Sequence, residues 1–388
     1  MQVDTSSAHS DDLLHGEALR KLSQPDRNLA TALVMGVLRW QIALDAELAK
    51  LLVRPDQPLP EEIRLALRMG AFQLRHMDRI PPHAALSESV ELVRTAGHPK
   101  AAGLVNAVLR KLSTKSAPGK PIMESIDAMA NRLGHPAWMV GRWETFYGRK
   151  AASAICEYDQ HEPTRGELFV RDQAAEEVDA NLIDDGSRLI AELAAASHPS
   201  PQRIWDACAA PGGKTSVLAQ RHPAAQLLAT DISPKRLQAM RRRLEIELPA
   251  REIRTLAADA ARLPESEGSF DLILCDVPCS GTGTLARNPE IRHRLQPSEF
   301  ERQAARQKEI LKAALGRLQP GGRLFYSTCS LEPEENEEVV RSVLAQSDLR
   351  ANLRTLPVAE LLEHLRSGGM IRDDADHLKQ LVRADLLR

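Results

Sequence analysis

The sequence contains few cysteines, no large excess of positive or negative charge, and no clear export signal. Five cysteines, an odd number in a chain of 388 residues, do not indicate a disulfide framework. Cys275 and Cys279 have no second pair at zinc-like spacing, so no metal is expected. No hydrophobic run is expected to span a membrane, and the polar, acidic residues 1–12 do not resemble a signal peptide. These absences predict a cytoplasmic protein without a membrane-bound part.

Net charge is small over the whole chain but unevenly distributed. The formal net charge is −2, and 43% hydrophobic with 27% charged residues is typical of a soluble globular protein. Residues 1–150 carry +4 and residues 151–388 carry −6, which together give that −2. A basic run is usually only a solvated surface, but beside a catalytic domain it is a candidate phosphate-contacting surface. Much of the positive excess lies in one stretch: Lys100, Arg110, Lys111, Lys115, Lys120, Arg132, Arg142, Arg149 and Lys150.

The first 112 residues show helical periodicity and no strand-like alternation. Apolar residues recur at helical spacing, and Pro25 stands early in its run, where a helix start accepts it. The pattern predicts an antiparallel helical bundle. The start signal and the helices after it are Ser23-Gln-Pro-Asp-Arg27 and residues 63–74, 85–96 and 103–112.

A linker and further helices are predicted next. Residues 113–121 are polar and carry Pro, Gly and Lys, which is typical of a linker. Two or three more helices follow, one of them at residues 137–147, and residues 167–171 predict a short strand. The aromatic residues of that helix are interpreted as packing anchors rather than base-stacking platforms: Trp138, Trp143 and Phe146.

Beyond residue 187 helices and strands alternate regularly. The predicted strands are residues 204–207, 226–232, 253–259, 270–276 and 323–330. Helices are predicted at 187–196 and 297–318, and Pro320-Gly-Gly322 predicts a turn before the last strand. This alternation predicts a doubly wound, Rossmann-like α/β domain, whose parallel strands end at one edge where a ligand binds.

The stretch Arg203-Ile-Trp-Asp-Ala-Cys-Ala-Ala-Pro-Gly-Gly-Lys-Thr215 predicts a strand, a glycine-rich turn and a helix start. Gly212 and Gly213 lack Cβ, so a ligand can approach the backbone closely. The helix then offers free N–H groups to an anion such as a carboxylate, while Asp206 is placed to meet a cationic amine.

The turn fits two other nucleotide-binding motifs poorly. A nucleotide-hydrolase P-loop needs glycine at position 208, where the chain has Cys208, and a dinucleotide site needs G-x-G-x-x-G, which is missing. If the rest of the chain gave no matching signals, this stretch would be interpreted as an ordinary glycine-rich βα turn without a ligand. Asp231 suits a ribose hydroxyl, Asp259 an adenine amino group, and the turn a methionine end. Together they predict S-adenosylmethionine as cofactor.

Two cysteines end different strands at the same edge. Cys279 lies in Asp276-Val-Pro-Cys-Ser, and Cys329 lies in Ser-Thr-Cys-Ser330. Either thiol alone would be interpreted as a small buried hydrophobe. Beside a methyl-donor pocket the pair indicates covalent catalysis of methyl transfer to C5 of cytosine. C5 alone is a poor nucleophile, and it becomes reactive only after a thiolate has added to C6. Asp276 would stabilise that adduct near N3.

The motifs resemble those of a known family. Asp206-Ala-Cys-Ala-Ala-Pro-Gly-Gly-Lys-Thr215, Asp276-Val-Pro-Cys-Ser-Gly-Thr-Gly283 and Tyr326-Ser-Thr-Cys-Ser330 look like the signatures of RNA cytosine-C5 methyltransferases. Leu22-Ser-Gln-Pro-Asp-Arg27, Gly36-Val-Leu-Arg-Trp40 and Leu104-Val-Asn-Ala-Val-Leu-Arg110 resemble a NusB-like RNA-binding domain. The combination is similar to the Sun/Fmu-type bacterial enzymes that methylate 16S ribosomal RNA.

The resemblance implies roles for individual residues. Cys329 is implied as the nucleophile, with Cys279 aiding product release. RNA, most of all 16S ribosomal RNA, is implied as the partner of a monomeric enzyme, with Arg110, Lys111 and Lys115 as RNA-binding residues. The implied cofactor contacts are Cys208, Ala209, Ala210, Pro211, Gly212, Gly213, Lys214, Asp231, Asp259 and Asp276.

The resemblance covers most of the chain and implies three parts: a NusB-like all-α domain at 1–115, linker helices with a small reduced α/β subdomain at 116–185, and a methyltransferase domain at 186–388. The family's opening helix is missing or reduced here, and residues 178–189 are compressed. The chain also stops at Leu387-Arg388 without the family's final Asp-Gly-Phe-Phe strand.

Two other functions were considered. A non-catalytic RNA-binding or ribosome-assembly factor would use the same fold as a scaffold, but Cys279, Cys329 and Asp276 are all present, which argues against it. A small-molecule methyltransferase would not need a basic helical domain.

Overall fold

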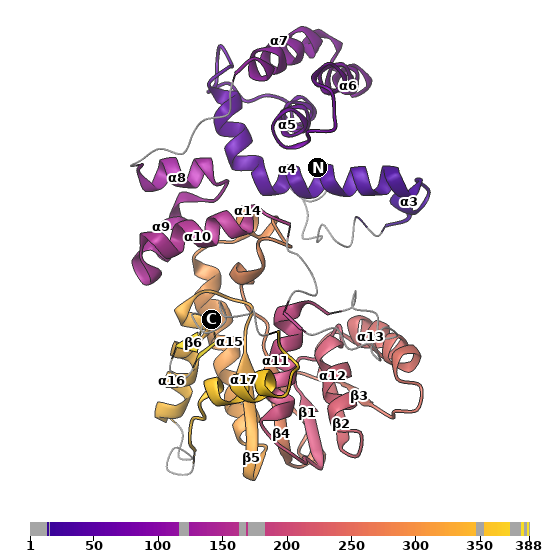
Figure 1. Cartoon of the computed structure of the whole chain (residues 1–388), viewed down its shortest axis with the longest axis vertical. Helices are drawn as coiled ribbons and strands as arrows, with labels where there is room; N and C mark the ends of the chain where they lie inside the picture. The colour runs from indigo at the N-terminus through magenta and orange to yellow at the C-terminus, as the bar shows by residue number, and fades with distance from the viewer. Residues whose placement is uncertain are drawn as a thin grey trace. The chain divides into compact units, whose positions relative to one another are not determined.

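The computed structural model describes residues 14, 16–115, 124–162, 168–169, 183–346, 353–372, 382–383 and 386–387. Contacts divide the chain into two compact units (Figure 1). The helical unit comprises Met1–Pro163 and Thr284–Arg294, and the α/β unit comprises Thr164–Gly283 and Leu295–Arg388. The domain limits at 115 and 185 stay a prediction.

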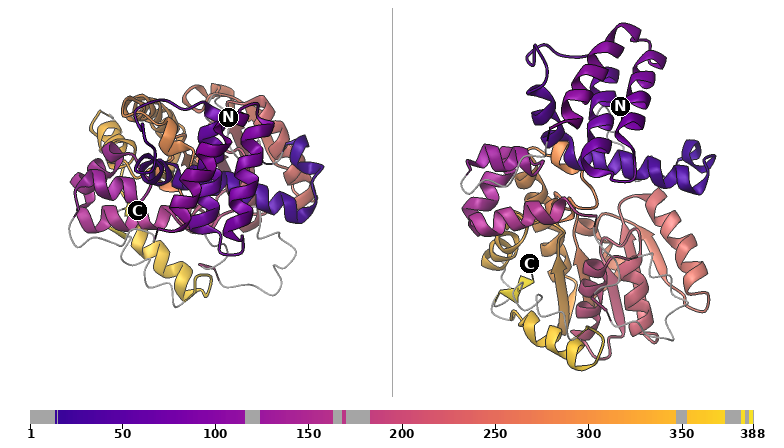
Figure 2. Two further views of the ribbon diagram at one scale, coloured as in Figure 1. Left: turned by 90° about the horizontal axis from the view of Figure 1, so that it is seen from above. Right: turned by 45° about the horizontal axis from the view of Figure 1, so that its top comes forward.

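The helical unit confirms the predicted bundle. The Ser23 side chain caps the longest helix by accepting a hydrogen bond from the Asp26 N–H, and Pro25 lies in its first turn. Helices α4 to α7 pack on one another in sequence (Figure 2). The described helices of four or more residues are α3 (Glu17–Arg20), α4 (Gln24–Ala49), α5 (Glu61–His76), α6 (Pro82–Thr95), α7 (Ala102–Ser113), α8 (Ile126–Arg132), α9 (Ala137–Tyr147), α10 (Arg149–Asp159) and α14 (Ile291–Arg294).

Helix α4 corrects one expectation. By length and composition alone it could cross a membrane, although no run of the sequence was expected to reach that length. Its residues Val37, Leu44 and Leu48 are buried in a core shared with α5, α6 and α7. Only 28% of its most apolar stretch is buried, so α4 packs on the bundle through one stripe of its surface. In α9, Trp143 is fully buried, which confirms it as a packing anchor, whereas Phe146 is 40% exposed.

The α/β unit confirms the predicted doubly wound fold. Five parallel strands lie in the order β3-β2-β1-β4-β5 (Figure 1). The strands are β1 (Arg203–Asp206), β2 (Gln226–Asp231), β3 (Arg254–Ala257), β4 (Phe270–Asp276), β5 (Leu318–Ser327), β6 (Val382–Arg383) and β7 (Leu386–Leu387). The helices are α11 (Asp185–Ala196), α12 (Gly213–Arg221), α13 (Pro234–Glu247), α15 (Ser298–Leu315), α16 (Glu337–Gln346) and α17 (Val358–Ser367).

Alternation along the strands fills two cores, one on each face of the sheet. Ile204 of β1 packs in a core with residues of α11, α12 and α13. The next residue, Trp205, packs in a second core with Ile310 and Ala314 of α15. Because both faces are covered, the three central strands β1, β2 and β4 are mostly buried and apolar, and each ends in an aspartate.

The last sheet strand differs from the prediction. Pro320-Gly-Gly322 was expected to turn into the strand but lies inside β5. Phe270 pairs with Leu318 and Leu272 pairs with Arg323, so several residues of β5 are accommodated opposite a short step of β4. Gly321, with φ +81°, makes this irregularity possible.

The predicted strand at 167–171 lies mostly outside the described residues. Phe169 forms an antiparallel bridge with Ile371, and Leu168 and Phe169 join a small core with α11 and α17. Near the end of the chain β6 pairs with β7 in an antiparallel two-stranded sheet.

Candidate functional site

The turn between β1 and α12 has the predicted form. Gly212 adopts the left-handed conformation, with φ +96°, and a Cβ there would lie 2.6 Å from the Met240 side chain. Only glycine therefore fits. Among the residues that the structure describes, no side chain caps the start of α12, so these leave the N–H groups of its first turn available to an anion.

Asp206 holds this turn from inside. Its side chain is buried, and one carboxylate oxygen accepts a hydrogen bond of 2.6 Å from the Thr215 hydroxyl. Burial raises the pKa of Asp206 to about 7. Within the protein its partner is Thr215 in the first turn of α12, and a contact between Asp206 and a cationic amine stays a prediction.

Asp231 and Asp259 follow the next two strands. Asp231 is buried and accepts hydrogen bonds from the Ala210 N–H, at 3.3 Å, and the Ser233 N–H, at 2.9 Å. It thus ties the glycine-rich turn to the start of α13. Asp259 is half-buried and accepts from the Ala261 N–H at 3.0 Å. Both carboxylates lie at the carboxyl edge of the parallel sheet, as the sequence predicts.

Lys214 and Asp276 form an ion pair at the same edge. The Lys214 Nζ lies 2.7 Å from one oxygen of Asp276, and the Ser327 hydroxyl donates to the other at 2.8 Å. Burial is the largest single influence and works to lower the pKa of Lys214, but Asp276, together with Asp184 and Asp206, offsets it and the net pKa is raised. Lys214 therefore stays a cation, and it also donates to the Ser187 hydroxyl at 3.1 Å.

The two predicted cysteines meet in the structure. The Sγ atoms of Cys279 and Cys329 are 3.2 Å apart, and both thiols are free. The hydrogen bond from Cys279 lowers the pKa of Cys329, which is exposed, with Lys214 acting in the same direction. The same hydrogen bond and burial raise the pKa of Cys279. The opposite directions of the two pKa shifts favour Cys329 over Cys279 as the thiol that loses its proton first.

The other cysteines do not share this environment. Burial raises the pKa of Cys156 to about 12 and also raises the pKa of Cys208 and of Cys275. None of the three is prepared to act as a nucleophile.

Glu335 is a residue that sequence reasoning missed. Its carboxylate is fully buried and accepts from the Ser280 N–H at 2.8 Å, from the Ser280 hydroxyl, and from the Ser330 hydroxyl at 2.5 Å. Gln307 donates to it at 3.1 Å. Since Ser280 and Ser330 directly follow the two cysteines, one carboxylate fixes both cysteine loops. The repeated Cys-Ser pair is the sequence signal that could have pointed to a shared acceptor.

Asn336 supports the Cys329 loop in the same way. Its side-chain amide donates to the backbone carbonyls of Ser330 and Glu332, each at 2.9 Å, and accepts from the Thr328 hydroxyl at 2.6 Å. The loop is thereby fixed on both sides of the thiol.

The predicted RNA-binding residues lie together on the helical unit. Arg110 and Lys111 occupy the last turn of α7, Lys115 follows it, and all three are exposed. The Lys115 carbonyl accepts a hydrogen bond of 2.7 Å from Arg75. Within the described part of the chain, no group of three or more His, Cys, Asp or Glu side chains could hold a metal ion.

The thiol pair predicts the pH dependence of Cys329 alkylation. A lowered pKa means that the iodoacetamide reaction should reach half its maximal rate below the ordinary thiol value of 9.0. Cys279→Ala removes the hydrogen bond and should move this midpoint to higher pH, whereas Cys279→Ser keeps a donor and should move it less. Peptide-resolved mass spectrometry measures the rate at Cys329. An unchanged midpoint in Cys279→Ala would show that Cys279 does not tune Cys329.

Two long stretches of the chain match known protein families. Residues 194–371 match the family described as 16S rRNA methyltransferase RsmB/F, and residues 1–114 match the NusB family. The ribosomal RNA small subunit methyltransferase B of Xanthomonas campestris pv. campestris is 31% identical, over 92% of this chain and 87% of that protein. The protein of that name from Pectobacterium carotovorum subsp. carotovorum is 30% identical, over 90% of each.

A solved structure shares the fold. The crystal structure of PH0851 superposes with a TM-score of 0.63 at 20% identity, covering 84% of this chain and 82% of that one. The matched family is S-adenosylmethionine-dependent, which confirms the cofactor predicted from the turn and the acidic strand ends. The resemblance drawn from the sequence motifs is confirmed by the family match. The chain belongs to the family of ribosomal RNA small subunit methyltransferases B.

Proposed function

We propose that this chain methylates C5 of a cytosine in 16S ribosomal RNA through a covalent bond between Cys329 and C6 of the base. The observation that carries the proposal is the thiol pair, with Sγ atoms 3.2 Å apart and the lowered pKa on Cys329. The relatives named above support ribosomal RNA of the small subunit as the substrate. We further propose that the chain acts as a monomer in the cytoplasm, without a metal.

The residues at the carboxyl edge of the sheet fit S-adenosylmethionine. The uncapped start of α12 suits the methionine carboxylate, and Gly212 leaves its backbone open. Asp231 and Asp259 stand where a ribose hydroxyl and an adenine amino group need acceptors. When bound, the cofactor supplies an electrophilic methyl group.

Cys329 begins the reaction on the base. Its thiolate forms a bond to C6, and the electrons of the C5–C6 double bond move toward N3, which takes up a proton. C5 of this adduct is then nucleophilic enough to accept the methyl group. A base removes the C5 proton, and its bonding electrons re-form the C5–C6 double bond as the C6–S bond breaks with its electron pair returning to Cys329. N3 then gives up the proton that it had taken. Cys279, which stays protonated, is placed to aid this release.

Asp276 and Lys214 would face the ring of the base. In our proposal Asp276 stabilises the adduct at N3, and the charged Lys214 keeps that carboxylate in place. The Ser327 hydroxyl restrains it from the other side. Because C6 cannot be reached inside a stack, the target cytosine must be unpaired or flipped into the site.

Alanine variants of the two cysteines test the function. Cys329→Ala should lose methylation, since no other thiolate is available, and should still bind S-adenosylmethionine in calorimetry. Cys279→Ala should accumulate an RNA adduct, seen as a denaturant-resistant band of lower gel mobility. Bisulfite sequencing of 16S ribosomal RNA locates the product. Full activity of Cys329→Ala would refute the nucleophile, and failure of the wild-type protein to bind S-adenosylmethionine would favour a scaffold role.

Glu335→Gln tests the shared support of the cysteine loops. The amide replaces one acceptor oxygen by a donor, and each buried group left unpaired costs about 1–3 kcal/mol. We expect single-turnover methylation to slow by about 10-fold or more, since misplaced catalytic groups are costly. Calorimetry should show unchanged S-adenosylmethionine binding. Glu338→Gln, an exposed change on α16, is the control. A wild-type rate for Glu335→Gln would mean that its contacts do not position the thiols.

Charge reversal on the helical unit tests RNA binding. Replacing Arg110, Lys111 and Lys115 with Glu should raise the RNA dissociation constant, because phosphate contacts are lost. Each lost contact should lower the salt slope of binding by about 0.7–0.9. Filter binding across a salt series measures both, and S-adenosylmethionine binding should not change. An identical affinity and slope would leave the three residues as a solvated surface, with Arg241, Arg242 and Arg243 as the next candidates.

A further inference from the structure

The chain leaves the α/β unit directly after the Cys279 loop and returns to it eleven residues later. The intervening stretch, Thr284–Arg294, belongs to the helical unit by its contacts. We call it the inserted segment. In sequence the segment lies between the Cys279 motif and α15, which both belong to the α/β unit. Its neighbours in sequence therefore do not account for its packing against the helices.

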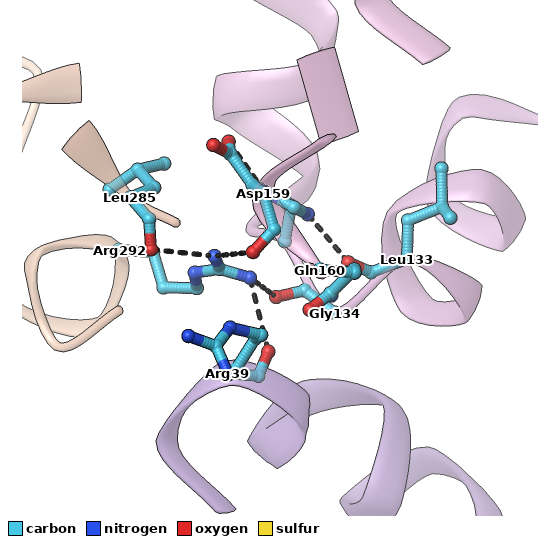
Figure 3. Close-up of polar contacts among 8 residues, drawn as sticks. Arg39, Leu133, Gly134, Asp159, Gln160, Leu285 and Arg292 are labelled. Atoms are coloured by element: carbon cyan, nitrogen blue, oxygen red, sulfur yellow. Dashed lines mark hydrogen bonds and ion pairs between the residues drawn. The ribbon is translucent and has the colours of Figure 1, made fainter. Parts of the chain in front are cut away.

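Arg292 fastens the inserted segment (Figure 3). Its side chain is 1% exposed, and its guanidinium donates to backbone carbonyls from separate parts of the helical unit. The acceptors are Arg39 at 3.1 Å, Gly134 at 2.9 Å, Asp159 at 3.4 Å and Leu285 at 3.4 Å. Arg292 is thus hydrogen-bonded to α4, to the loop after α8, to the end of α10 and to the start of its own segment.

The surroundings suit a buried cation without a direct carboxylate partner. Asp159 is the last residue of α10, and Gly134 follows the end of α8, so both carbonyls carry the negative end of a helix dipole. The Asp159 carboxylate lies 3.2 Å from His135 Nε2. Burial lowers the pKa of Arg292 to about 10, which leaves it charged at neutral pH.

Two further contacts hold the segment to α4. Arg39, itself buried, donates to the Ala286 carbonyl at 2.7 Å, and His293 Nε2 donates to the Leu38 carbonyl at 2.7 Å. Gly134, with φ +65°, has no room for a side chain, since a Cβ would lie 2.9 Å from the Arg39 carbonyl. The guanidinium therefore lies in a closely fitted recess of backbone.

The chain just before the inserted segment is bound to the Cys329 loop. The Gly283 N–H donates to the Cys329 carbonyl at 2.9 Å, and the Thr282 hydroxyl accepts from the Leu331 N–H at 2.8 Å. A Cβ on Gly283 would lie 2.9 Å from that same carbonyl. Along the chain, Gly283, which is bound to the Cys329 loop, is therefore only two residues before Leu285, whose carbonyl accepts from Arg292.

We infer that Arg292 is a positioning residue for the reaction, which fixes the Cys279 loop against Cys329 from within the helical unit. The inference rests on the proposed function for its catalytic consequence. Its geometric part does not, because the distance between the two thiols can be probed without RNA or cofactor. A purely structural Arg292 would instead affect folding and RNA binding alone.

Arg292→Lys is the variant that tests the inference. Lysine keeps the charge but cannot donate to four separated carbonyls. We expect kcat for methylation to fall about 10-fold to 100-fold, as for a small misplacement of catalytic groups. KM for RNA and the dissociation constant of S-adenosylmethionine should stay within about 2-fold, since neither set of contacts is altered. Arg94→Lys, at an exposed residue of α6 paired with Glu91, is the control and should match the wild type.

Alkylation gives a second measurement that does not depend on activity. If the Cys279 loop moves in Arg292→Lys, Cys329 loses its hydrogen-bond donor, and its iodoacetamide midpoint should move to higher pH. Wild-type kcat and an unchanged midpoint would overturn the inference. Loss of RNA binding with normal alkylation would also overturn it, leaving a structural role. Should the wild-type protein not methylate cytosine, the proposed function fails, while the alkylation midpoint still decides the geometric part.

Discussion

The parallel pairing of β4 with β5 is the constraint on which the candidate site depends. It sets Asp276 opposite Ser327, and each cysteine follows within a few residues of these two strand ends. Because side chains alternate along a strand, a shift of one residue in this register would turn Asp276 away from Ser327 and Lys214. The bulge around Gly321 absorbs the extra length of β5 far from this end, so the register at the carboxyl edge is kept.

Two carboxylates serve this edge in different ways. Asp276 faces Lys214 and Ser327 and is partly accessible to solvent. Glu335 is enclosed and gathers donors from both cysteine loops and from Gln307. A carboxylate accepts hydrogen bonds only, with room for about four, which matches this crowded set of donors. One carboxylate thus lies partly open beside a lysine, and the other is enclosed and holds two loops together.

Sequence reasoning predicted the elements whose signals are local. The apolar strands, the glycine-rich turn at Gly212 and the two cysteine motifs follow from short patterns, and the structure brings Cys279 and Cys329 together as expected. The path of β5 through Pro320-Gly-Gly322 was missed because a bulge depends on the partner strand. Glu335 and Arg292 were missed for a similar reason, since most of their partners, such as Ser280 and Gly134, lie far away in sequence and no periodicity marks them.

The helical unit is discontinuous in sequence, and this has a consequence for its biosynthesis. A nascent chain that has emerged only to Pro163 contains α4, α8 and α10 but not Arg292. The inserted segment emerges only after β1 to β4. Until then the carbonyls of Arg39, Gly134 and Asp159 lack the hydrogen bonds from Arg292, and the Arg39 side chain lacks its acceptor, the Ala286 carbonyl. Vectorial folding of this protein therefore cannot finish one unit before beginning the next. The N-terminal helices are completed by a part of the chain that is translated after most of the sheet.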